Sequence, residues 1–157
     1  LGDVYKRQRF DMKFLMRIHN TLKGFEVLEF LPLFLTRLYL FYVLWFAGIN
    51  KIDSFDKFSG YLGTLGVPLP DLFTWLVIIT EAGGAALILI GLFVRWSSIP
   101  LLVVMFFAGY LVHWQNGWPH EANGIEFAAI YSLMLLTLLC FGGGKYLSLD
   151  YWVSSNK

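Results

Sequence analysis

The sequence predicts an all-α fold: a bundle of four transmembrane helices with an N-terminal interfacial helix. Of its 157 residues, 57% are hydrophobic and only 15% are charged, whereas soluble domains carry about 25% charged residues. Residues 72–94 contain a single ionisable side chain, Glu81. At roughly 1.5 Å rise per residue, such a run crosses a hydrocarbon core of about 30 Å. The composition therefore indicates an integral membrane domain.

The beginning of the chain differs from the rest. Residue 1 is leucine, and the sequence LGDVYKRQ resembles the translation of a sequencing adaptor. We therefore expect residues 1–11 to be a non-native leader. Residues 12–29 interleave basic and apolar side chains. This pattern predicts an amphipathic helix lying on the membrane. Residues 30–150 are the four-helix domain, and residues 151–157 are a short tail.

Four apolar stretches predict the spans, at about residues 30–50, 72–94, 96–114 and 125–141. A loop over residues 51–71 joins the first two and contains the turn-forming VPLPD. A tight turn at Arg95 follows the second span, and the polar stretch QNGWPHEANG follows the third. Three glycines from Gly142 onward end the fourth.

Lysine and arginine predict the orientation. They occur in the N-terminal segment, at Arg95 and in the tail, whereas the polar loop between the third and fourth spans has none. Since short cytoplasmic loops are enriched in these residues, we expect both termini to be cytoplasmic. The net charge of +1 with no basic stripe argues against a nucleic-acid partner. The single cysteine, Cys140, excludes a disulfide or dithiol centre within the chain.

Two charged residues are predicted deep in the membrane. Glu81 lies about 15 Å below the outer surface and Arg37 about 21 Å below it, by helical rise. A lone carboxylate at that depth costs about 2.5 kcal/mol or more, so we expect an ion pair between Arg37 and Glu81. The pair is either a buried contact that sets the helix register or part of a polar cavity that binds a ligand or moves a proton.

Three further residues are predicted to meet at the outer ends of their helices: Lys51, His113 and Glu126. Histidine and glutamate are common at helix ends that face water, so simple interfacial anchoring is one interpretation. The alternative is an outward-facing pocket in which histidine exchanges protons near neutral pH. His120 and Glu121 lie in the adjoining loop, but the spacing matches no standard metal-ligand pattern, and we expect no metal site.

The ordered set of motifs resembles the DoxX family of small four-helix membrane proteins. The motifs are RLYLFYVLWFAGINK, EAGGAALILIGLFVR, a histidine ending the third span, a glutamate opening the fourth, and Ser148-Leu149-Asp150. The resemblance implies a bacterial inner-membrane protein whose polar positions are Arg37, Lys51, Glu81, His113 and Glu126. Some members of that family serve as membrane subunits of thiosulfate:quinone oxidoreductase.

The resemblance and the polar residues predict a membrane subunit that supports quinone-linked redox chemistry at the outer face. Quinone is the cofactor implied, with membrane lipids and a soluble or membrane redox partner. Two alternatives stay open. One is a small-solute transporter or channel, and the other is a non-catalytic anchor or assembly scaffold.

Overall fold

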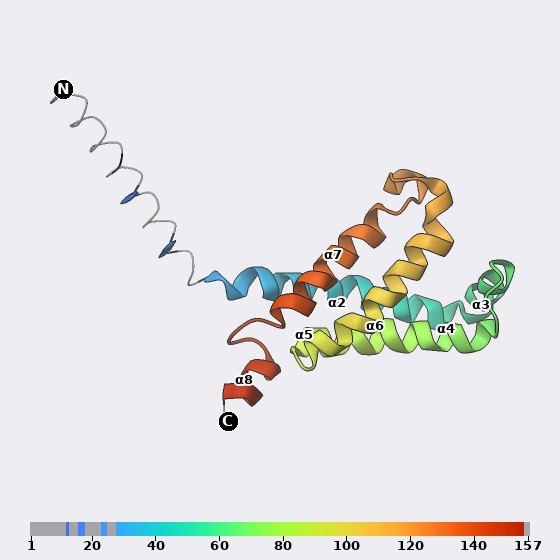
Figure 1. Cartoon of the computed structure of the whole chain (residues 1–157). Helices are drawn as coiled ribbons and strands as arrows, with labels where there is room; N and C mark the ends of the chain where they lie inside the picture. Colours follow the sequence, from blue (N-terminus) through green and yellow to red (C-terminus); the bar gives the residue numbers. More distant parts are fainter. Residues whose placement is uncertain (1–11, 13–15, 18–22, 25–27, 156–157) are drawn as a thin grey trace, which may run out of the picture.

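The protein's structure is a computed structural model that describes residues 12, 16–17, 23–24 and 28–155. All regular secondary structure among these residues is helical (Figure 1). The predicted leader at residues 1–11 and most of the predicted interfacial segment at residues 12–29 lie outside the described residues. The all-α prediction is confirmed.

The helices form four apolar runs along the chain. The first run is the helix α2 (Phe30–Asp53). The second run consists of α4 (Pro70–Ile78), η2 (Ile79–Gly83) and α5 (Gly84–Ile90). The third consists of α6 (Val94–Phe107), η3 (Ala108–His113) and η4 (Trp114–Asn116), and the fourth is α7 (Glu126–Phe141). The first three runs are long and apolar enough to cross a membrane, and α7 is a shorter apolar helix of 16 residues. The architecture is the predicted four-helix membrane bundle.

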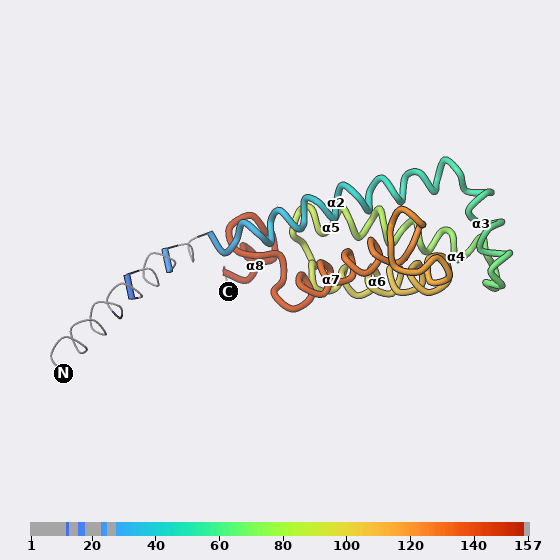
Figure 2. The backbone as a smooth tube through the Cα atoms, turned by 90° about the horizontal axis from the view of Figure 1, so that it is seen from above, coloured from blue at the N-terminus to red at the C-terminus, as the bar shows by residue number. Residues whose placement is uncertain are grey.

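The second run packs closely against the first. Figure 2 shows α2 beside α4 and α5, with the hairpin of α6 and α7 on the far side of α5. A Cβ on Gly48 would lie 3.0 Å from the Ala82 backbone nitrogen, so a side chain there would force the two helices to shift apart, and glycine favours their close approach. The core between the runs is aliphatic and includes Leu40, Leu44, Ala85, Ile88, Leu101, Leu135 and Leu138.

Two predicted boundaries are wrong. The expected loop at residues 51–71 contains a helix, α3 (Phe55–Thr64), because Phe55, Phe58 and Leu62 recur at helical spacing. The predicted second span at residues 72–94 ends as a helix at Ile90, because Gly91 takes φ +71° and closes the helix. The Leu92 N–H bonds to Leu87 O at 3.0 Å and the Gly91 N–H to Ile88 O at 3.1 Å, which is a Schellman motif.

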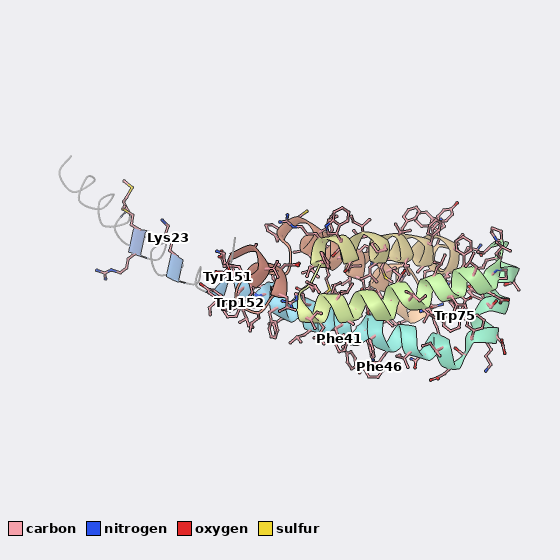
Figure 3. All side chains as sticks on the ribbon, turned by 90° about the horizontal axis from the view of Figure 1, so that it is seen from below. Lys23, Phe41, Phe46, Trp75, Tyr151 and Trp152 are labelled. Carbon is pink, nitrogen blue, oxygen red and sulfur yellow. The ribbon has the colours of Figure 1, made fainter. Side chains whose placement is uncertain are left out.

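Large apolar side chains cover the outside of the bundle. Trp96 is 73% exposed and Leu133 is 66% exposed, which suits a surface that faces lipid rather than water. Figure 3 shows Tyr151 and Trp152 at one end of the bundle and Trp75 at the other. Aromatic side chains at both ends are typical of the two membrane–water interfaces.

The beginning of α2 and the last helix, α8 (Leu149–Ser155), lie at the same end of the bundle, opposite α3 (Figure 1). Because the first span begins and the last helix lies at the same end, the number of spans is even. Arg95 and Lys145 also lie at this end. Its assignment to the cytoplasm stays a prediction from the positions of lysine and arginine.

Candidate functional site

The most buried acidic group of the described chain is paired with a lysine. Glu81 is 3% exposed, and its Oε2 accepts a hydrogen bond from Lys51 Nζ at 2.6 Å. The Lys51 ammonium also lies 5.3 Å from the centre of the Phe58 ring, within the range of a cation–π contact. The pair therefore joins the first two spans and is covered on one side by an aromatic ring from α3.

Glu81 owes its position to an irregular turn. It lies in η2, a π-helical turn between α4 and α5, and such turns occur often at functional sites. Ala82, its neighbour in η2, is the residue that approaches Gly48, and Lys51 follows Gly48 by one turn of α2. Close backbone approach at Gly48 thus carries the Lys51 ammonium to the Glu81 carboxylate.

The Lys51 side chain is partly exposed at the protein surface. Its side chain is 21% exposed, while that of Glu81 is 4% exposed. A buried carboxylate is therefore connected to the outside by a single ammonium group. In chemical terms, the pair offers a hydrogen-bond donor at the surface and a negative charge or proton site behind it.

The predicted ion pair between Arg37 and Glu81 is wrong. Arg37, which is 1% exposed, donates four hydrogen bonds to backbone carbonyls, to Ile88 O at 2.7 Å, Leu89 O at 2.5 Å, Gly143 O at 2.9 Å and Leu147 O at 2.8 Å. The first two carbonyls belong to the last turn of α5, where carbonyls lack i+4 helical N–H partners. Of the two, Ile88 O also accepts the Gly91 N–H. A guanidinium satisfies these groups and also opposes the negative end of the helix dipole.

The depths predicted from helical rise do not hold. The helix α2 continues past Lys51 to Asp53, and α3 follows before α4 begins. Glu81 is thus close enough for Lys51 to reach it. The small residues Gly48 and Ala82 were a usable signal, since they allow the two helices to cross one turn away from Lys51.

The Ser148-Leu149-Asp150 motif serves the same end of the bundle as Arg37. Asp150 accepts the backbone N–H of Phe93 at 2.8 Å and that of Val94 at 3.0 Å, so it caps the beginning of α6. Ser148 Oγ donates to Gly91 O at 2.8 Å. Arg37, Ser148 and Asp150 together hold the turn between α5 and α6 against the C-terminal segment, and we call them the Arg37 clamp. The sequence did not reveal this role.

His113 and Glu126 lie together at the loop of the α6–α7 hairpin. His113 Nδ1 is 2.8 Å from Asn123 O, and Glu126 Oε2 accepts hydrogen bonds from both the backbone N–H and Nδ1 of His120 at 3.0 Å. Among the residues described, no hydrogen bond or ion pair links either of them to Lys51. Figure 1 shows this hairpin loop set apart from α3.

The same loop has the only group of possible metal ligands found in the described part of the chain. One ligand atom from each of His120, Glu121 and Glu126 lies within 4.8 Å of the others. His120 and Glu121 are exposed, and exposed carboxylates often gather without an ion. The expectation of no metal site stays a prediction.

Comparison with known proteins adds a family. A family model described as DoxX matches residues 32–114. An "Inner membrane protein YphA" of Escherichia coli strain K12 is 31% identical over 108 residues, which cover 68% of this chain and 76% of that protein. An "Uncharacterized protein" of Haemophilus influenzae is 28% identical over 122 residues, covering 75% of this chain and 80% of the relative. No solved structure matches the chain significantly.

Proposed function

The chain belongs to the DoxX family and is a multi-pass membrane protein, and from this premise we propose that it is an inner-membrane subunit supporting quinone-linked redox chemistry at the outer face. The observation that carries the proposal is the ion pair of Lys51 with the buried Glu81 in the π-helical turn. An inner-membrane location is supported by the Escherichia coli relative, which is named as an inner membrane protein.

The residues around Lys51 suit a quinone in their chemistry. A quinone presents two carbonyl acceptors on a flat ring. The Lys51 side chain is partly exposed, and its ammonium group is a hydrogen-bond donor. The Phe58 ring lies 5.3 Å from that ammonium and offers an apolar face. When bound, a quinone takes up two electrons and two protons.

The chain's own contribution is to bind and to handle protons. Lys51 donates a hydrogen bond to a carbonyl oxygen and can pass on a proton. Glu81, held at 2.6 Å from Lys51 Nζ, is the anionic partner that keeps the ammonium charged and oriented. The proton that Lys51 gives up is replaced from water at its partly exposed side. Electrons come from a redox partner or a bound substrate, because a chain with one cysteine has no dithiol centre.

His113 and Glu126 have a secondary place in this proposal. They lie in the hairpin loop with His120 and make no described contact with the Lys51–Glu81 pair. We assign them proton exchange at the surface rather than contact with the quinone.

The test is to measure quinone retained by protein purified in mild detergent, by extraction and chromatography. We expect quinone bound to the wild-type protein and lost from Lys51→Met and Glu81→Gln. Lys57→Met is the matched control, because Lys57 is an exposed lysine on α3, and it should retain quinone. His113→Ala should retain it too.

Two results would argue for the other functions. Quinone-free wild-type protein with unchanged activity of its partner would overturn the redox proposal and favour a scaffold. Solute flux in proteoliposomes that stops in Glu81→Gln would favour a transporter with Glu81 on its path.

A further inference from the structure

A second site lies at the opposite end of the bundle from Lys51. A cavity of about 860 Å³ opens between the start of α2, the start of α6, the end of α7 and α8. Its volume is within the usual range of about 300–1,000 Å³ for ligand sites. The walls combine aromatic side chains with two cations and two carboxylates, so the cavity suits a ligand with both apolar and charged parts.

Arg95 is the cation in this cavity with unused donors. Its only described hydrogen bond is from Nη2 to Cys140 O at 3.2 Å, and no described carboxylate pairs with it. The other charges are engaged: Lys145 bonds to Glu29, and both oxygens of Asp150 accept backbone N–H groups of α6. A guanidinium with free N–H groups is well matched to a phosphate, which it binds with two parallel hydrogen bonds.

The sum of the formal charges restricts the ligand further. Arg95 and Lys145 are balanced by Glu29 and Asp150 in the same cavity wall. A ligand with net negative charge would meet these carboxylates, whereas a ligand with one phosphate and one amine would complement both signs. The phosphate then lies on Arg95, and the amine lies toward Glu29 or Asp150.

The apolar walls indicate where the rest of the ligand lies. Phe93, Trp96 and Phe141 line the cavity and are 58%, 73% and 70% exposed. These side chains adjoin the apolar surface of the bundle, so hydrocarbon chains can lie along them and continue into the bilayer. Tyr151 also lines the cavity and lies at the end of the bundle opposite Trp75, where one membrane–water interface is expected (Figure 3).

We propose that this cavity binds the headgroup of a zwitterionic aminophospholipid, with its phosphate on Arg95 and its acyl chains along Trp96 and Phe141. Basic pockets between transmembrane helices are known to hold lipid headgroups on the cytoplasmic side. The predicted orientation places this end of the bundle in that leaflet. The site is separate from Lys51 and Glu81 and does not depend on the redox proposal.

The experiment is native mass spectrometry of delipidated full-length protein given equal amounts of phosphatidylethanolamine and phosphatidylglycerol with identical acyl chains. We expect one phosphatidylethanolamine bound to wild type in preference to phosphatidylglycerol. Arg95→Gln should reduce that retention by about tenfold, the size expected for loss of a charge-assisted pair. Lys57→Gln, at the other end of the molecule, should leave it unchanged.

Two more measurements keep the outcome decisive. Trp96→Ser removes an apolar wall without changing charge and should also weaken retention, which covers the case in which Arg95→Gln does not fold. Inorganic phosphate should not displace the lipid. Equal retention of the two lipids, unchanged retention in both cavity variants, or displacement by inorganic phosphate would overturn the proposal.

Discussion

Replacing Lys51 by methionine should destabilise the protein more than any other exposed or half-buried lysine substitution. The variant removes the cation that lies 2.6 Å from Glu81 Oε2 and leaves a carboxylate whose side chain is only 4% exposed. Breaking a buried ion pair from one side costs about 3–5 kcal/mol, because the remaining charge is uncompensated. For a chain of this size each kcal/mol lowers Tm by about 2–4 °C, so we expect a loss of about 6–20 °C.

The assay is thermal unfolding in mild detergent, followed by tryptophan fluorescence. In Lys51→Met with Glu81→Gln, no charge remains, so the double variant should be more stable than Lys51→Met alone.

The control is Lys57→Met on α3, where the lysine is exposed and the change should stay within about 0.5 kcal/mol. If Lys51→Met unfolds within about 2 °C of the wild type, then Glu81 is not held by Lys51. A double variant as unstable as the sum of the two single variants would also refute the reasoning.

Substitutions at Arg37, Asp150 and the adjoining Gly91 test the Arg37 clamp by the same thermal assay. Arg37→Lys cannot reproduce four hydrogen bonds to carbonyls and should lower Tm by about 4–12 °C, from about 2–3 kcal/mol; an unchanged Tm would show that the carbonyls are otherwise satisfied. Asp150→Ala uncaps α6 and should cost about 1–2 kcal/mol, whereas Asp150→Asn, which keeps one acceptor, should cost less. Gly91→Ala places a Cβ 2.6 Å from Arg37 Nη2 at φ +71° and should cost about 2 kcal/mol or more. Its control is Gly60→Ala on α3, where a Cβ meets nothing within 4 Å and Tm should hold or rise slightly; equal effects at Gly91 and Gly60 would contradict the close packing at the clamp.

The irregular turns explain the parts of the site that sequence patterns could not supply. The apolar composition located the four runs, apart from their ends, but it contains no signal for the π-helical turn at Ile79–Gly83 or for the one at Ala108–His113. Each such turn changes which face the following residues present. The pairing of Glu81 with Lys51 rather than Arg37 depends on the first of these turns and on the length of α2.

The sequence by itself determined the environment and the general architecture of this protein, because apolar runs of about 20 residues can satisfy their backbone groups in lipid only as helices. It also identified Glu81 and Arg37 as residues that needed partners, since an isolated charge in lipid is unstable. Only the tertiary structure decided which partners they have. Arg37 bonds to carbonyls in the last turn of α5, and Lys51 meets Glu81 where Gly48 lets two helices approach. Both outcomes follow from helix ends and crossing points, which depend on contacts between residues distant in the chain.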